Sequence, residues 1–169
     1  MATDLFARPR IGDDLQHHWN RMIAWHYTTG EKFRLIIACG ELRPMAESSQ
    51  DRAILWFSLN QQWEPTASKM RKNADGSLTP LTREQAYQLG NGLVRFGFPS
   101  ARCIPWWMLG KKARIPFQTR VRLEYVGRKL GADPQEWCGV THPISVDRLI
   151  IEVFKKNEWV RVREARGWP

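Results

Sequence analysis

Apolar and aromatic runs alternate with polar, glycine-containing segments along the chain, which predicts a mixture of strands and helices. The run at 22–27 is rich in aliphatic and aromatic residues and predicts a strand that ends at about Thr28. Glu31 follows Thr28 at the spacing of a capping box, and Gly40 supplies a left-handed C-terminal stop. Residues 22–40 therefore read as a strand, a turn and a helix.

Weaker patterns of the same kind extend over the rest of the chain. Residues 1–12 contain few apolar groups and read as an N-terminal arm, and the acidic pair at 13 and 14 predicts the start of a short first helix. Further strands are expected at 52–60, 93–98, 144–154 and 158–163, the last two as a terminal hairpin. Further helices are expected at 82–90 and 116–130, with a short one from about Pro65. The pattern favours one α+β domain over residues 13–169.

Composition narrows the class of protein. Of the 169 residues, 43% are hydrophobic and 25% are charged, as in an ordinary globular domain. The chain has no run of about 18 uncharged apolar residues, and its first residues lack the apolar core of a signal peptide, so we expect a cytoplasmic protein without a membrane span. Three cysteines without a C-x-x-C pair support neither a disulfide framework nor a zinc site, and no cluster of acidic metal ligands is evident.

The net charge of +9 favours a polyanionic partner such as nucleic acid. Between residues 102 and 129, eight basic residues stand against the single acid Glu124. The candidate nucleic-acid-binding residues in this region are Lys111, Lys112, Arg114 and Arg120. A solvated basic surface would explain the same run equally well. Arg95, in the strand expected at 93–98, faces either solvent or a phosphate in this interpretation.

Polar residues gather where the first two expected strands end. His26 lies beside Tyr27 and Thr28, and a lone strand histidine is more often structural than catalytic, although such boundaries are common places for sites. In the second stretch Ser58 and Asn60 share one face of the strand. Nine tryptophans, most of them expected in the core, leave a few that could line a pocket for a flat ring.

Both stretches resemble the ADP-ribosyltransferase-like fold. The first is a strand bearing His-Tyr-Thr that runs into a helix ending in Gly-Glu-Leu-Arg-Pro, and the second is a Trp-Phe-Ser strand leading to Trp-Glu-Pro-Thr-Ala. The resemblance covers about residues 22–67. It is to the histidine-first branch, which includes diphtheria-type toxins, poly-ADP-ribose polymerases, DNA-targeting toxins and RNA 2'-phosphotransferases.

The resemblance implies a split, mostly antiparallel sheet with flanking helices and with NAD held between its halves. His26 would match the histidine that hydrogen-bonds the adenosine-side ribose, with Tyr27 and Thr28 beside it. Ser58 would match a position beside the nicotinamide, and Asn60 and Trp63 complete the cofactor-binding candidates.

The same resemblance calls for a catalytic glutamate near the ribose. Glu136 lies late in the chain, as the third family motif does, and is preferred. Glu64 is kept as a site-lining alternative, although a first-turn helix charge before Pro65 would explain it. Neither lies in the Glu-x-Glu pattern of protein-modifying relatives.

The implied reaction is transfer of ADP-ribose from NAD to a macromolecular acceptor, nucleic acid or protein, with nicotinamide leaving. Two alternatives remain open at this point: a non-catalytic nucleic-acid-binding module, and an RNA 2'-phosphotransferase-like enzyme on the same fold. The sequence leaves the acceptor and the oligomeric state open.

Overall fold

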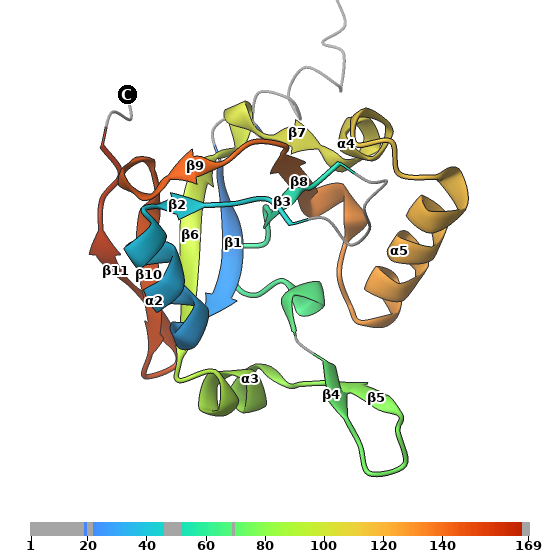
Figure 1. The fold of residues 1–169 in the computed structure, drawn as a ribbon, viewed down its shortest axis with the longest axis horizontal. Helices are drawn as coiled ribbons and strands as arrows, with labels where there is room; N and C mark the ends of the chain where they lie inside the picture. The colour runs from blue at the N-terminus through green and yellow to red at the C-terminus, as the bar shows by residue number, and fades with distance from the viewer. Residues whose placement is uncertain (1–18, 20–21, 46–51, 69, 167–169) are drawn as a thin grey trace, which may run out of the picture.

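The computed structural model of the protein describes residues 19, 22–45, 52–68 and 70–166. The expected N-terminal arm at 1–12 and nearly all of the expected first helix lie outside these residues. Within the described part, the expected α+β architecture and the mostly antiparallel sheet are both confirmed (Figure 1). No helix in the described ranges is long and apolar enough to cross a membrane.

Seven strands form the main sheet in the order β11-β10-β6-β1-β3-β8-β7, and neighbouring strands run antiparallel. Their bounds are β1 Ile23–Thr29, β3 Leu55–Ser58, β6 Leu93–Pro99, β7 Ile104–Pro105, β8 Trp137–Val140, β10 Ile150–Lys155 and β11 Glu158–Arg163. Two further antiparallel pairs are β2 Glu41–Leu42 with β9 Ile144–Ser145, and β4 Met70–Lys72 with β5 Leu78–Pro80.

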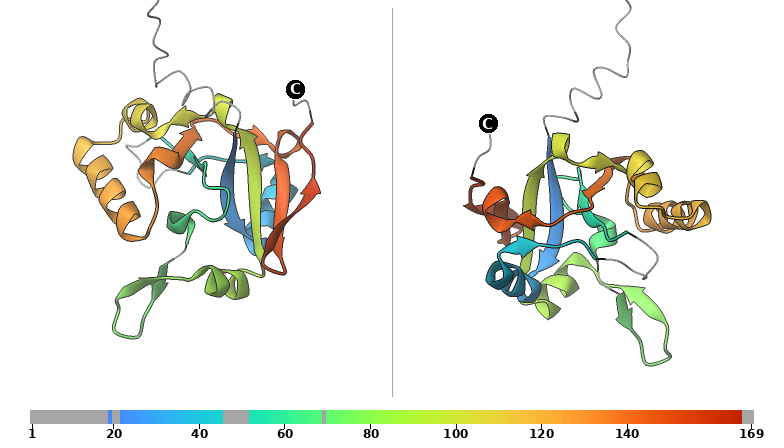
Figure 2. Two further views of the ribbon diagram at one scale, coloured as in Figure 1. Left: turned by 180° about the vertical axis from the view of Figure 1, so that it is seen from behind. Right: turned by 45° about the horizontal axis from the view of Figure 1, so that its top comes forward.

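Four α-helices lie around the sheet in the described part of the chain. They are α2 Gly30–Cys39, α3 Arg83–Leu89, α4 Trp106–Lys112 and α5 Phe117–Lys129. Short 3-10 turns at Pro65–Ala67, Ser100–Arg102, Pro134–Glu136 and Val146–Arg148 connect other elements. Figures 1 and 2 show α4 and α5 beside β7 and β8, at the end of the sheet away from β11.

Several sequence-based boundaries are confirmed because local signals set them. Thr82 caps α3 in a capping box with Gln85, and Gly40 ends α2 with a φ of 76°. The single strand expected over 144–154 is wrong. Ile144–Ser145 instead pairs with β2, and a 3-10 turn separates it from β10. Residues 73–77 close a small hairpin between β4 and β5.

The pairing between β1 and β3 is the least extensive in the main sheet. All seven residues of β1 pair with β6, whereas β1 and β3 share the single pair Trp25–Ser58. The sheet thus consists of a β11-β10-β6-β1 half and a β3-β8-β7 half, and we call their meeting point the junction. The Gln61 side chain supports it, because Nε2 donates to the backbone oxygens of Ile23 (2.8 Å) and Leu59 (2.7 Å).

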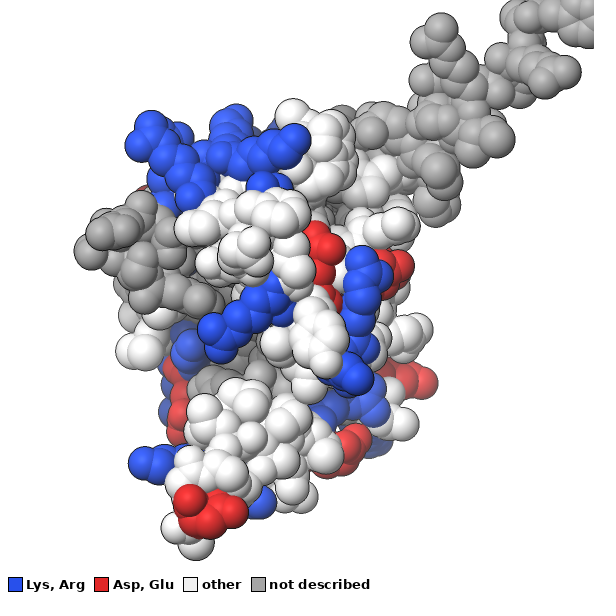
Figure 3. Space-filling model, turned by 90° about the vertical axis from the view of Figure 1, so that its right-hand side faces the viewer, with Lys and Arg blue, Asp and Glu red and all other residues white. Residues whose placement is uncertain are grey.

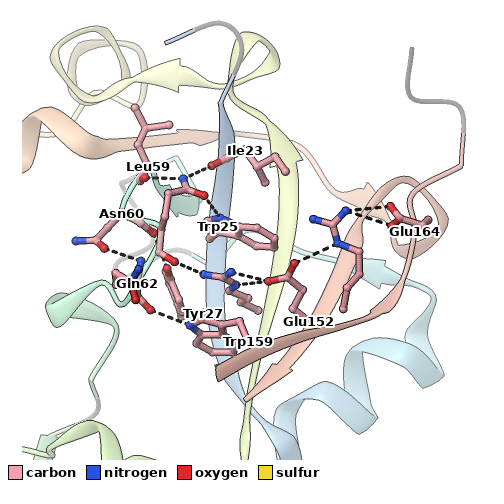
Figure 4. A network of polar contacts seen from close by, with 12 residues as sticks. Ile23, Trp25, Tyr27, Leu59, Asn60, Gln62, Glu152, Trp159 and Glu164 are labelled. Atoms are coloured by element: carbon pink, nitrogen blue, oxygen red, sulfur yellow. Dashed lines mark hydrogen bonds and ion pairs between the residues drawn. The ribbon is translucent and has the colours of Figure 1, made fainter. Parts of the chain in front are cut away.

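A buried ion pair lies beside the junction (Figure 4). Arg95 on β6 and Glu152 on β10 are directly opposite each other, and two guanidinium nitrogens of Arg95 donate to Glu152 Oε2 at 2.8 and 2.5 Å. The guanidinium lies 3.9 Å from the ring centroid of Trp25 and 4.6 Å from that of Trp159. Both charged residues are buried, so the expectation that Arg95 faces solvent or a phosphate is wrong. Charge neutralisation and cation–π contact explain its burial.

We expect Arg95→Met to lower the free energy of unfolding by about 3–5 kcal/mol, because it leaves the Glu152 carboxylate buried without its partner. Urea denaturation followed by tryptophan fluorescence measures this. The matched control is Arg43→Met, which removes an exposed pair with Glu41 at 3.2 Å and should cost less than about 1 kcal/mol. Equal small effects of the two substitutions would contradict the structural importance of the buried pair.

Candidate functional site

The candidate residues on β1 point to opposite faces of the sheet. His26 and Thr28 share the face on which Phe96 and Val94 of β6 pack, together with residues of α2. Tyr27 points to the other face, where it contacts Trp63. The structure therefore does not gather all of the proposed NAD-binding side chains on one surface.

His26 lies at the junction and links the two halves of the sheet. Its Nδ1 is 2.9 Å from the backbone oxygen of Trp56 on β3, and since a carbonyl only accepts, Nδ1 carries the proton. Burial is the main cause that lowers the pKa of His26; the Trp56 carbonyl opposes this shift, and Lys32 adds to it. The neutral ring thus presents Nε2 as a hydrogen-bond acceptor. No described residue bonds to that nitrogen.

On the opposite face, Tyr27 and Asn60 fix the loop that follows β3. The Tyr27 hydroxyl donates to the Asn60 backbone oxygen at 2.6 Å. Burial raises the pKa of Tyr27 to about 12, so the phenol stays protonated at neutral pH. The Asn60 side-chain oxygen accepts from the backbone N–H groups of Gln62 (2.9 Å) and Trp63 (3.2 Å). These bonds give the loop a defined shape.

Glu64 is buried and its carboxylate is fully engaged by neighbouring donors. It accepts from Ser58 Oγ at 2.7 Å and from Trp137 Nε1 at 3.3 Å. It also caps the following 3-10 turn, accepting from the backbone N–H and hydroxyl of Thr66 at 3.1 and 2.6 Å. The carboxylate thereby joins β3, the turn and β8. The position of Glu64 before the turn therefore explains only part of its role, because the carboxylate also bonds to Ser58 and Trp137.

Glu136 is the more accessible of the two candidate glutamates. It ends the turn before β8, where its backbone oxygen accepts from the Leu59 N–H at 2.8 Å, and it is partly exposed. Burial is the largest cause that raises the pKa of Glu136, followed by the carboxylates of Asp133 and Glu64; the Asn60 side chain opposes this by hydrogen bonding. Glu136, Glu64, Asn60 and Tyr27 therefore form one electrostatic group on this face.

The start of α2 differs from the expected capping box. Thr29, not Thr28, precedes the helix, and its hydroxyl is buried without a partner among the described residues. Backbone carbonyls take the place of a side-chain cap: Gly30 N–H donates to Gly92 O (2.9 Å) and Glu31 N–H to Gly90 O (3.1 Å). A side chain at Gly30 would lie 2.1 Å from the Asn91 oxygen, so this close approach requires glycine. These donors are not free for a phosphate.

The proposed nucleic-acid-binding residues lie elsewhere, on α4, α5 and the turn between them. Lys111 and Lys112 occupy the last turn of α4, Arg114 follows with a φ of 60°, and Arg120 is the fourth residue of α5. The exposed side chains of the first three are consistent with the expected basic surface.

The sequence analysis did not identify the residues of β6 and β11 that hydrogen-bond to the loop after β3. Arg95 donates to the Gln61 backbone oxygen at 2.6 Å, and Trp159 Nε1 donates to that of Gln62 at 2.8 Å (Figure 4). Trp159 lies almost 100 positions away in the sequence, and no local pattern indicates this contact. Among the described residues, no group of three His, Cys, Asp or Glu side chains could hold a metal ion.

Comparison of the chain with family models, with curated proteins and with solved structures finds no match. A functional assignment therefore depends on the chemistry of the residues described above.

We expect the stability of the protein to depend on His26 between neutral and mildly acidic pH. Because the folded-state pKa lies below the unfolded value of about 6.5, the unfolded chain binds the proton first, and stability falls as the pH falls through this range. Thermal unfolding at about pH 7.5 and about pH 5.5 measures the loss. The loss of stability between these two pH values should be smaller in His26→Gln than in the wild type.

The control for this measurement is His142→Gln, which replaces a histidine outside the sheet core. An identical pH dependence in the wild type and His26→Gln would show that the His26 ring does not titrate as its burial implies.

Proposed function

We propose that the protein has an ADP-ribosyltransferase-like fold and transfers ADP-ribose from NAD to a macromolecular acceptor, releasing nicotinamide. The observation that carries the proposal is the setting of Glu136, a partly exposed carboxyl group with a raised pKa beside Glu64, Asn60 and Tyr27. It directly precedes β8, in a sheet whose two halves share one residue pair. The resemblance of residues 22–67 adds to this.

The chemistry needs a carboxylate near the reacting carbon. When the bond from ribose C1' to nicotinamide breaks, its electron pair moves to the ring nitrogen, and positive charge develops on the ribose. A fixed carboxylate at that position stabilises the charge. The acceptor's nucleophilic atom then bonds to C1' and gives up its proton. Glu136 suits both tasks, since a raised pKa makes its carboxylate a better base than an ordinary glutamate.

The His26 side chain lies on the opposite face of the sheet from Glu136, and its ring suits a sugar ligand. Because Nδ1 donates to Trp56, the group that approaches Nε2 must itself be a donor. A ribose hydroxyl is such a group, whereas a phosphate oxygen is not. The neutral ring at the junction therefore favours a sugar ligand over an anionic one.

The two glutamates have different roles in this proposal. Glu64 already accepts from Ser58, Thr66 and Trp137, so it positions the turn and β8 rather than contacting the sugar. Glu136 is the catalytic residue. Ser58 acts through Glu64, because its hydroxyl donates to that carboxylate.

The phosphotransferase alternative would be favoured by arginines gathered around Glu136. Arg95, which contacts the loop after β3, is held by Glu152 and the Gln61 carbonyl and is not free to bind a phosphate. No observation therefore favours this alternative over transfer of ADP-ribose.

We expect Glu136→Gln to reduce nicotinamide release from NAD by roughly 10²- to 10³-fold, because the amide cannot stabilise the developing charge. Release is measured on the purified protein with and without DNA, RNA and cell lysate. The rate should rise with pH through the raised pKa of Glu136, since the ionised form is the active one.

The matched control for this assay is Glu158→Gln, which makes the same change on the exposed strand β11. Full activity in Glu136→Gln would remove Glu136 from the mechanism. Absence of both nicotinamide release and an NAD-induced thermal shift in the wild type would contradict the proposed function as a whole.

A further inference from the structure

Helix α5 leaves a stripe of two aromatic side chains and a valine exposed. An amphipathic pattern ordinarily marks the face of a helix that packs on the core. Here Phe117, Val121 and Tyr125 are 65%, 47% and 61% exposed, and spaced four residues apart they lie about 6 Å from one another along the helix axis. The helix contacts the domain through another side: a side chain at Gly127 would lie 2.4 Å from the ring of Trp137, and Leu123 packs near it.

Cations accompany the exposed rings. The guanidinium of Arg120 and the ammonium of Lys129 each lie 5.5 Å from the ring centroids of Phe117 and Tyr125, respectively. On α4, Trp107 is 67% exposed and precedes Lys111 and Lys112 by one turn. Figure 3, which views the α5 side of the molecule, shows basic side chains along its upper edge and across its middle, around uncharged surface.

The positive charge on this face is largely unpaired. Residues 106–130 contain seven lysines and arginines and one acid, Glu124. Trp106 Nε1 donates to Glu124 at 2.7 Å, and Arg128 lies 3.7 Å from it. Within the described ranges, none of the other six basic residues makes an ion pair, and Arg120 Nε is buried without a hydrogen-bond partner. The face therefore offers cations to an external anion.

We propose that the α4–α5 face, formed by Trp107, Lys111, Lys112, Arg114, Phe117, Arg120, Val121, Tyr125 and Lys129, binds single-stranded nucleic acid. Unpaired bases stack on exposed aromatic rings, and the phosphates between them are neutralised by the neighbouring cations. Duplex bases are already stacked and cannot use the rings, so the face selects single strands. This site involves none of the residues assigned to NAD and does not rest on the proposed function.

Other occupants fit the face less well. A second copy of the chain would bring two basic faces together, and like charges oppose that contact. A lipid surface requires a broad apolar face. Here Arg120 and Lys129 lie beside the exposed rings of α5, so cations interrupt the apolar surface. Alternating rings and cations match the alternation of bases and phosphates in a single strand.

The first test is fluorescence anisotropy with labelled oligothymidylate and oligouridylate, with duplex DNA of the same length for comparison. We expect the wild type to bind one or both single strands more tightly than the duplex. Phe117→Ala and Tyr125→Ala should each weaken binding by roughly fivefold or more, as removal of a ring that stacks on a base does. Leu35→Ala, which truncates an equally exposed apolar side chain on α2, should leave the affinity unchanged.

The second test measures affinity as a function of salt. Combining Lys111→Glu with Lys112→Glu should reduce the steepness of log K against log salt by about 0.7 for each phosphate that the protein no longer neutralises. The control combines Lys155→Glu with Lys156→Glu, which makes the same change of charge at the exposed end of β10 and in the turn that follows it.

Three outcomes would overturn the proposal. Equal weakening by the α5 and control substitutions would show non-specific charge attraction. Duplex bound as tightly as single strands would remove the role of the rings. Absence of binding to either single strand would remove the site, and vesicle binding, or a dimer that Tyr125→Ala dissociates, would then assign the face to a membrane or to self-association. Because NAD is absent from these measurements, their result is separate from that of the nicotinamide assay.

Discussion

The buried Arg95–Glu152 pair constrains the arrangement of the candidate site. Two charges can lie inside a domain only when they neutralise each other and their remaining donors are used. Arg95 meets this condition by bonding to Glu152 and to the Gln61 carbonyl between the indole rings of Trp25 and Trp159. One half of the sheet thereby holds the loop that carries Asn60 and Glu64, residues of the other half.

Differences in environment give the two candidate glutamates different chemistry. Glu64 is buried, and four donated hydrogen bonds occupy its carboxylate. Glu136 is partly exposed, and burial together with nearby carboxylates raises its pKa. The environment of Glu64 suits a structural role, and that of Glu136 suits a reacting group. His26 combines the two properties, since one ring nitrogen bridges the junction and the other is a free acceptor among the described residues.

The α4–α5 face differs from the candidate site in the exposure and the hydrogen bonding of its side chains. The site consists of buried and partly buried polar groups whose donors are mostly used, whereas the face exposes aromatic rings and cations without acidic partners in the described part of the chain. A catalytic site requires fixed groups, and a nucleic-acid surface tolerates mobile ones. Both kinds of surface can therefore exist in one domain.

Local interactions made part of this fold predictable from the amino-acid sequence alone. The strand and helix over 22–40, the Gly40 stop, and the Thr82–Gln85 cap of α3 follow from residues within one or two turns of each other. The preference for Glu136 over Glu64 came from a resemblance, and its electrostatic setting became visible only in the fold. Long-range contacts determine that Gly90 and Gly92 cap α2, that Arg95 is buried, and that the stripe on α5 is exposed. Each of these features depends on partners that are distant in the chain. Hydrophobic periodicity and capping signals are local, so they do not indicate such partners.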